Sequence, residues 1–230
     1  MKYLLWDIDG TLLLTNFAGV SALKQAIKTI YGLDNFQFTN SLAGRTDTFI
    51  AKEAIREIKG SATAEEISSL LKLYASALPS YLQLKQGHLL PNVKALLQDL
   101  DTNPAACSLL LTGNCEKGAL AKLEYFHLAA YFDFNLSAFG EISELRDDLA
   151  QAAWTKLKKL NPALTPQDII IIGDTPHDIT CAAAIGARSL IVTTGSTFTT
   201  EELASYNPWK IITELPSTAK DFLSIILSEE

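Results

Sequence analysis

Paired acidic residues follow the first apolar segment of the chain, where the sequence from Asp7 to Thr11 reads DIDGT. Residues two positions apart in an extended strand point the same way, so the carboxylates of Asp7 and Asp9 can face one ligand. A second acidic group lies in GDTPHD, from Gly173 to Asp178. Two carboxylates about 4 Å apart repel by roughly 4 kcal/mol at an effective dielectric constant of 20. Such a cluster needs a proton or a cation among its members.

The ligand atoms of this acidic group favour Mg²⁺ as that cation. Asp7, Asp9, Asp174 and Asp178 offer hard oxygen ligands, and no cysteine or histidine cluster accompanies them. Hard oxygen ligands are typical of Mg²⁺ sites. We expect the ion to offset the repulsion and to leave positive charge that holds a phosphate group. For Asp178, a structural role in the first turn of the following helix is an equal alternative.

The two acids of the first motif need different tasks. We expect Asp7 to be an ionised nucleophile and a metal ligand, whereas Asp9 protonates a leaving alcohol and then activates water. Two like acids whose pKa values are pushed apart are a known route to an acid and a nucleophile in one site. The backbone carbonyl of Asp9 is a further candidate metal ligand.

Polar groups also follow a second apolar segment, where Thr112, Gly113 and Asn114 stand in sequence. They offer a hydroxyl, an unhindered backbone N–H and a side-chain amide, which are donors that suit phosphate oxygens. Helix capping is an equal alternative for Asn114.

Apolar runs without polar alternation predict strands that are buried on both faces of a parallel sheet. The strong runs cover residues 3–8, 107–112, 169–173 and 189–193, and weaker ones cover 132–136 and 210–213. Helical periodicity indicates helices over 91–100, 116–126, 144–160 and 176–185. This alternation predicts an α/β fold with a doubly wound, mainly parallel, Rossmann-like sheet. Ligands of such sheets bind beyond the carboxyl ends of the strands, which is where the candidate residues lie.

Residues from about 15 to 86 interrupt this alternation, because they predict three helices (20–31, 48–58 and 64–84) and no strand of similar strength. We therefore expect a small inserted helical cap domain over 15–86. The core domain would comprise residues 1–14 and 87–230.

These motifs resemble a known family. The segments DIDGTL, TGN and GDTPHD, which begin at Asp7, Thr112 and Gly173, resemble motifs I, II and IV of the haloacid dehalogenase superfamily. The helical insert resembles the C1 cap of its phosphoglycolate phosphatase-like members. The resemblance implies an aspartyl-phosphate intermediate, Mg²⁺ held by Asp7, the Asp9 carbonyl and Asp174, and a hydrogen bond from Thr112 to the phosphate.

The third motif departs from the family, in which many members carry a lysine at the head of the helix before the third strand. Arg146 falls at that place here, and its guanidinium can neutralise both nucleophile and phosphate. Three lysines further along the same helix are rivals, which we interpret as its solvated face. Arg45, in the turn 43–47, resembles a position in the family's specificity loop, where it would meet a substrate carboxylate or second phosphate. A plain surface role for Arg45 is an equal alternative.

The bulk composition limits the partners. A net charge of −7 argues against nucleic acid or an anionic membrane as the binding partner, because both need a basic face. Three cysteines without a CxxC pair argue against disulfides and zinc, and favour a reducing, cytoplasmic location. We also expect no signal peptide and no membrane-spanning segment.

Taken together, the sequence predicts a Mg²⁺-dependent phosphatase acting on a small-molecule phosphate ester, as a monomer or homodimer. A phosphosugar mutase is one alternative, since it shares the first two motifs. A catalytically silent scaffold that binds a protein or a phosphometabolite is another. A dehalogenase or phosphonatase fits less well, because Asp9 is present and no cap lysine stands out.

Overall fold

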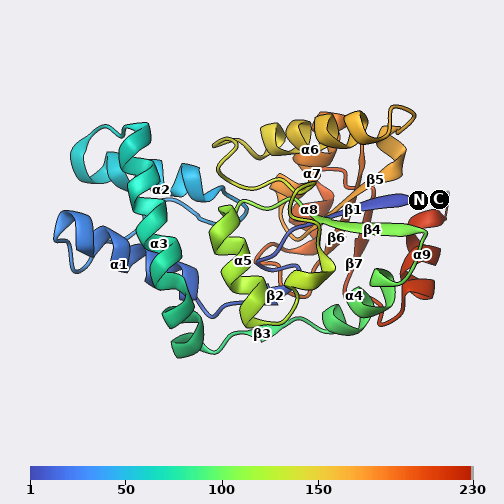
Figure 1. Ribbon diagram of the computed structural model, residues 1–230, viewed down its shortest axis with the longest axis horizontal. Helices are drawn as coiled ribbons and strands as arrows, with labels where there is room; N and C mark the ends of the chain where they lie inside the picture. The colour runs from blue at the N-terminus through green and yellow to red at the C-terminus, as the bar shows by residue number, and fades with distance from the viewer. Residues whose placement is uncertain (229–230) are drawn as a thin grey trace.

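The computed structural model describes residues 1–228, and its centre is a five-stranded parallel sheet (Figure 1). The strand order is β4-β1-β5-β6-β7. The strands are β1 (Lys2–Trp6), β4 (Ala106–Leu110), β5 (Ile169–Gly173), β6 (Arg188–Val192) and β7 (Lys210–Ile212). This sheet confirms the predicted α/β fold class.

Helices cover both faces of the sheet. Along β1, Leu4 and Trp6 pack into one apolar cluster, while Tyr3 and Leu5 pack into another on the opposite face. The first cluster includes residues of α4 (Val93–Asp101), α5 (Glu116–Tyr125) and α9 (Ala219–Leu227). The second includes residues of α6 (Arg146–Leu160) and α7 (Pro176–Ile185), and α8 (Thr200–Ala204) packs beside α7. The strands are therefore buried on both faces, which explains their unbroken apolar sequences.

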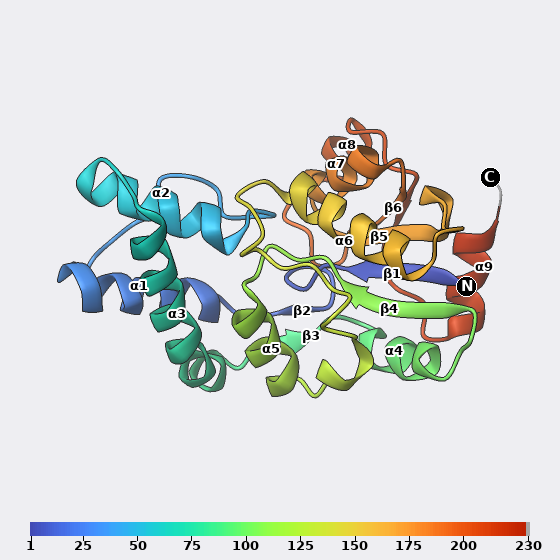
Figure 2. The same ribbon diagram turned by 45° about the horizontal axis from the view of Figure 1, so that its top comes forward.

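A separate helical unit stands at the end of the molecule away from the N-terminus (Figures 1 and 2). This cap consists of α1 (Ala18–Tyr31), α2 (Asp47–Lys59) and α3 (Ala64–Lys85), which share an apolar core of their own. The chain enters and leaves it through an antiparallel pair, β2 (Leu13–Leu14) and β3 (His88–Leu89). The three helices lie where the sequence predicts them, while the domain boundaries at 15 and 86 stay a prediction.

Two regions differ from the sequence-based expectation. Residues 132–136 form no strand; they follow a short 3₁₀ turn, Ala129–Tyr131. The Asp133 carboxylate accepts a hydrogen bond from the backbone N–H of Asn135 at 2.9 Å, and the Ser137 hydroxyl donates to the Asp133 carbonyl. Such local side-chain bonds compete with a strand ladder. The helices α8 and α9 were not predicted.

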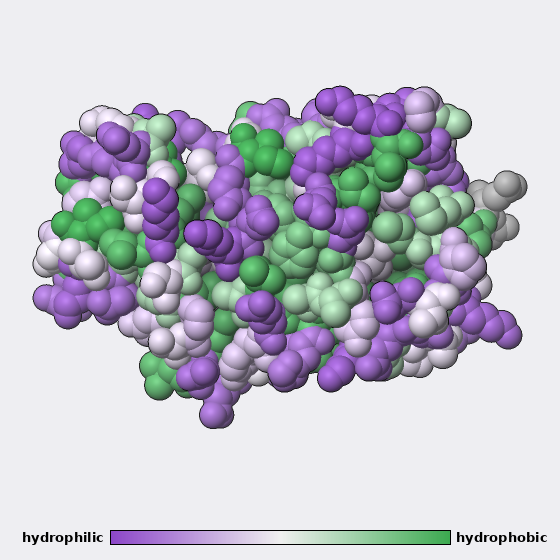
Figure 3. Space-filling model, in the orientation of Figure 1, coloured by the Kyte–Doolittle hydropathy of each residue, from purple (hydrophilic) through white to green (hydrophobic). Residues whose placement is uncertain are grey.

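The remaining surface features are ordinary. Hydrophilic side chains are spread over this face of both cap and core, and hydrophobic ones gather towards its middle (Figure 3). Within residues 1–228, no helix combines the length and apolar character that a membrane crossing requires.

Candidate active site

Three aspartates meet at the carboxyl edge of the sheet. Asp7 follows β1, while Asp174 and Asp178 follow β5, the neighbouring strand. The Asp7 backbone N–H still donates to the Ile172 carbonyl at 2.9 Å, which continues the pairing of the two strands into the site. All three side chains are buried, and one carboxylate oxygen of each lies within 4.8 Å of the others.

Gly10 makes room for this cluster. Its φ of 88° lies in the left-handed region that favours glycine, and a Cβ atom there would stand 2.3 Å from Oδ2 of Asp174. The next residue, Thr11, donates its hydroxyl to Oδ1 of Asp174 at 3.2 Å. The DIDGT turn therefore both supplies Asp7 and fixes the orientation of Asp174.

The three buried carboxylates repel one another, so a cation among them would stabilise their ionised forms. Burial raises the pKa of Asp7 to about 6, the negative charge of Asp178 adds to this, and Arg146 opposes it. The pKa of Asp174 is raised well above its ordinary value, mainly by burial and to a smaller extent by the negative charges of Asp178 and Asp7. A divalent ion would stabilise the ionised forms of these buried acids. Their oxygen-only ligand set fits Mg²⁺.

Asp178 is already fully engaged within the protein. Its Oδ1 accepts from Nη2 of Arg146 at 2.5 Å. Its Oδ2 accepts from the backbone N–H of Asp174 and Thr175, at 3.2 and 3.0 Å, and from the Thr175 hydroxyl at 2.7 Å. The arrangement caps the start of α7 and orients Arg146. Direct coordination of a metal by Asp178 stays a prediction that competes with these bonds.

Arg146 reaches the acids from the first residue of α6. Its Nη2 lies 3.3 Å from Oδ1 of Asp7 and also donates to the Leu111 carbonyl. The side chain is buried, and its Nε is the sole buried side-chain polar atom in residues 1–228 without a hydrogen-bond partner. Its lysine rivals Lys156 and Lys158 instead donate to backbone carbonyls of Ser137 and Leu164, which lie outside the helix. Arg146 is therefore the α6 cation that lies beside Asp7.

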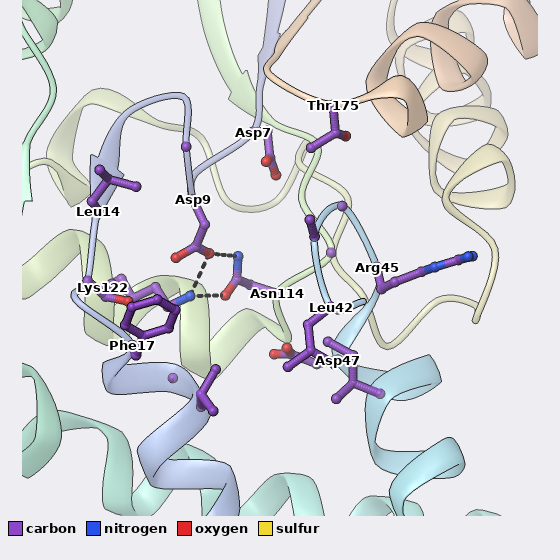
Figure 4. A pocket seen from close by; sticks show the side chains of 18 of the residues that line it. Asp7, Asp9, Leu14, Phe17, Leu42, Arg45, Asp47, Asn114, Lys122 and Thr175 are labelled. Carbon is purple, nitrogen blue, oxygen red and sulfur yellow. Dashed lines mark hydrogen bonds and ion pairs between the residues drawn. The ribbon is translucent and has the colours of Figure 1, made fainter. Parts of the chain in front are cut away.

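A second polar network surrounds Asp9 (Figure 4). Oδ2 of Asp9 accepts from Nζ of Lys122 at 2.5 Å and from Nδ2 of Asn114 at 2.8 Å. Lys122 also donates to Oδ1 of Asn114 at 2.5 Å, and Nδ2 of Asn114 reaches Oγ1 of Thr112 at 2.8 Å. The Thr112 hydroxyl accepts in this network, and its predicted hydrogen bond to the phosphate stays a prediction.

The sequence reasoning did not single out Lys122, although a signal for it exists. Lys122 lies on α5 one turn from Ala119 and beside Leu123, both fully buried, so it belongs to the apolar face of the helix. Lysine is rarely buried unless it is paired. A lysine on the inward face of the helix that follows the TGN motif is therefore evidence of an acidic partner.

Gly113 connects the core to the cap. A Cβ atom on Gly113 would stand 2.2 Å from the carbonyl oxygen of Arg45, and the Gly113 carbonyl accepts from the Asp47 backbone N–H at 2.7 Å. The loop that precedes α2 thus lies directly on the TGN turn. The phosphate contact of Gly113 stays a prediction. The close approach of the Arg45 backbone is a further reason why a glycine is needed at this position.

A cavity of about 490 Å³ joins the acidic cluster to the cap. Asp7, Asp9, Asp174 and Arg146 line its core end, as do Gly113 and Asn114, whereas Thr112 is fully buried and does not reach it. Arg45 also lines the cavity, but its guanidinium lies 4.7 Å from the centre of the Phe49 ring and points away from the Asp9 network (Figure 4).

The parallel sheet with helices on both faces places the chain in the α/β, Rossmann-like class of folds, with buried acids at the carboxyl edge of the sheet. Residues 4–192 match the family model for haloacid dehalogenase-like hydrolases, and the chain belongs to this family. The resemblance found in the motifs is thereby confirmed.

Solved structures with the same fold span almost the whole chain. A hydrolase from Pseudomonas syringae has a TM-score of 0.71 at 23% identity, covering 99% of this chain and 100% of its own. CbbY from Rhodobacter sphaeroides, in complex with phosphate, scores 0.70 at 16% identity over 93% and 94%. A protein from Bacteroides vulgatus, provisionally assigned as a beta-phosphoglucomutase, scores 0.71 at 18% identity over 100% and 91%. No curated protein matches the chain.

Proposed function

We propose that this chain is a Mg²⁺-dependent phosphatase that hydrolyses a small-molecule phosphate monoester through a phosphorylated Asp7. The supporting observation is the position of Asp7. Its carboxylate lines the cavity, lies within 4.8 Å of two further acids and is 3.3 Å from a buried guanidinium. A nucleophile held between a cation and a candidate metal site suits attack on a charged phosphate group.

Asp7, Asp174 and the backbone carbonyl of Asp9 would hold Mg²⁺, which supplies positive charge to the transferred phosphoryl group when it is bound. The side chains supply the rest. Arg146 neutralises charge that develops on the phosphate oxygens. A charged donor in a buried site stabilises such charge more strongly than it would in water.

The reaction has two steps. A carboxylate oxygen of Asp7 forms a bond to phosphorus while the bond to the ester oxygen breaks. Asp9 must enter this step protonated on the oxygen that faces the substrate, and it gives that proton to the departing alcohol. Asp9 then takes a proton from water, whose oxygen attacks the acyl phosphate, so that phosphate leaves and Asp7 is restored. Covalent catalysis divides one difficult displacement into two easier ones.

Lys122 and Asn114 hold Asp9 in the orientation that this proton transfer needs. Both bond to the same oxygen, Oδ2, and Asp9 is otherwise partly exposed to the cavity. The other oxygen is thus left to face the substrate. A group held in place by two donors loses little entropy when it reacts.

The test is the substitution Asp7→Asn, assayed with Mg²⁺ and acetyl phosphate. We expect the rate to fall by roughly 10³-fold or more, because the amide cannot act as the nucleophile. Asp101→Asn makes the same change at an exposed residue at the end of α4 and should leave the rate unchanged. Folded Asp7→Asn protein that hydrolyses acetyl phosphate at the wild-type rate would disprove the proposal.

One observation favours a phosphosugar mutase as the second candidate, namely the fold shared with the provisional beta-phosphoglucomutase over the full chain. A mutase returns the phosphoryl group to a sugar instead of to water. Incubation with a sugar monophosphate and a trace of sugar bisphosphate distinguishes the two, since a mutase yields an isomer and a phosphatase yields inorganic phosphate.

A further inference from the structure

The cap end of the cavity differs in character from the core end. Its apolar lining comes from the end of β2, the first turns of α1, the loop before α2, and α2 itself. The side chains are those of Leu14, Phe17, Val20, Leu23, Leu42 and Ile50. A substrate whose phosphate lies beside Asp7 therefore places its alcohol portion against apolar groups.

Two of the three charged side chains at this end, Lys122 and Asp47, are hydrogen-bonded within the protein. Lys122 is bonded to Asp9 and Asn114, and Arg45 packs over the Phe49 ring. Asp47 accepts from the Cys115 backbone N–H at 2.8 Å and adds negative charge to the cavity wall. Within residues 1–228, Arg45 is the cap-side cation of the lining that has no hydrogen-bonded partner, and its guanidinium lies over Phe49 and points away from the Asp9 network.

Neutral polar groups add little to this lining. The Asn16 amide donates to the backbone carbonyls of Lys85 and Gln86, and the Asn114 side chain is occupied in the Asp9 network. Tyr74 contributes one phenol, and Thr15 and Thr197 contribute hydroxyls. A polyhydroxylated alcohol would leave most of its hydroxyls without partners, and a buried polar group without a partner is costly.

Phe17 gives the apolar end an aromatic surface. The side chain is 77% exposed, although it lines the cavity (Figure 4). Its φ of 64° is uncommon for a residue other than glycine, so the backbone holds this ring out at the start of α1. An exposed aromatic ring at a cavity wall suits contact with another apolar or aromatic group.

We propose, on the basis of the phosphatase function above, that the alcohol released by this enzyme is uncharged and predominantly apolar, of the aryl or arylalkyl class. The phosphate is bound at the acidic core end, and the alcohol is bound by the apolar side chains of the cap. A cavity of this size accommodates an aromatic group beside the phosphate.

Three primary alkyl phosphates test this proposal, since their leaving groups are chemically alike: benzyl phosphate, phosphoglycolate and glucose 6-phosphate. Acetyl phosphate serves as a small reference substrate. We expect kcat/KM for benzyl phosphate to exceed that for each of the other two alkyl phosphates by about tenfold or more. We expect a lower kcat/KM for phosphoglycolate because its carboxylate would lie against apolar side chains. We expect the same for glucose 6-phosphate because its hydroxyls would lie there.

A matched pair of variants locates the preference. Phe17→Ala should lower the ratio of benzyl phosphate to acetyl phosphate kcat/KM by about tenfold. Leu84→Ala removes another exposed apolar side chain, 71% exposed on α3 and outside the cavity, and should leave both rates unchanged. Because both residues are exposed, both variants should fold.

The outcomes distinguish a failure of the apolar-alcohol proposal from a failure of the phosphatase function. A kcat/KM for phosphoglycolate or glucose 6-phosphate equal to or above that for benzyl phosphate would overturn the apolar-alcohol proposal and leave the phosphatase function standing. If Phe17→Ala left the ratio of benzyl phosphate to acetyl phosphate kcat/KM unchanged, the claim that this apolar face of the cap binds the alcohol would be overturned. Absence of hydrolysis of all three esters and of acetyl phosphate would overturn the phosphatase function and the assignment that rests on it.

Discussion

Lys122 is a buried cation whose surroundings give it a defined task. It is 4% exposed, and its ammonium group bonds to Asp9 and Asn114. A buried lysine remains charged only if partners compensate for the lost water. Here the charge of Asp9 and that of Asp47 raise the pKa of Lys122 against the lowering effect of burial. The ion pair therefore orders the acid that the proposed mechanism uses.

This task predicts a dependence on the leaving group. Lys122→Met should reduce kcat/KM for benzyl phosphate about tenfold more than for acetyl phosphate, because an alkoxide must be protonated as it leaves whereas acetate need not be. The measurement is the ratio of the two rates in the wild type and the variant. Lys117→Met, at an exposed position of the same helix, is the matched control.

A purely structural role for Lys122 would give a different result. Loss of packing alone would lower both rates by the same factor. Equal losses on the two substrates would therefore contradict the positioning role and leave the rest of the mechanism intact.

The sequence predicted the individual acids better than their partners. Asp7 and Asp174 end apolar strands, and strand pairing then brings them together without further information. The partners of Lys122 and the orientation of the Arg45 side chain depend on which residues the fold places beside them. Helical periodicity shows that Lys122 faces inward, but the distance to Asp9 arises only once the sheet and α5 are packed.

At the scale of elements, the loop before α2 is held on the core by glycines. A Cβ atom on Gly140 would stand 2.0 Å from the Gly113 carbonyl oxygen, which itself accepts from the Asp47 backbone N–H. The Gly140 carbonyl also accepts from the Thr48 hydroxyl at 2.7 Å. Two core turns and the first residues of α2 are therefore in backbone contact.

This contact predicts the effect of Gly140→Ala. The new methyl group meets backbone atoms that cannot move aside without shifting the TGN turn, so we expect kcat/KM for acetyl phosphate to fall about tenfold or more. Ser61→Ala, at an exposed position between α2 and α3, is the control and should change neither activity nor stability. A Gly140→Ala enzyme of wild-type activity would show that this contact does not position the site.

The sequence predicted the strands that are buried on both faces well, for a physical reason. A run such as Ile169–Gly173 is apolar throughout because both faces of β5 are covered. Residues 132–136 alternate apolar side chains with Asp133 and Asn135, and local hydrogen bonds around Asp133 hold them in a turn. Helix α8 spans only Thr200–Ala204, too few residues to show a period.

At the scale of the whole molecule, the cavity results from placing the cap over the carboxyl edge of the sheet (Figure 2). Neither unit contains it alone, because Asp7 and Asp174 belong to the core whereas Val20 and Ile50 belong to the cap. The sequence predicted that both units exist. Their separation, which sets the size and polarity of the cavity, depends on side-chain packing across the two units.

The buried acids also predict how the whole chain responds to metal. Mg²⁺ at about 100 times its dissociation constant should stabilise the fold by about 2.7 kcal/mol, or roughly 5–10 °C in Tm for a protein of this size. Without the ion, burial raises the pKa of Asp7 from 3.8 to about 6, so the folded state binds more protons than the unfolded state between these values. The contribution of Asp7 to stability therefore falls as the pH rises through this range.

The gain from Mg²⁺ should consequently be larger at about pH 7.5 than at about pH 5, where protons compete with the ion for the same carboxylates. Thermal unfolding at both pH values, with Mg²⁺ or with EDTA, measures the difference. Asp174→Asn removes one negative charge from the cluster and should raise the metal-free Tm while abolishing the gain from Mg²⁺. Asp101→Asn should alter neither quantity. If Asp174→Asn kept the full Mg²⁺-dependent gain, the ion would bind elsewhere, and the buried acids would need another explanation for their shared position.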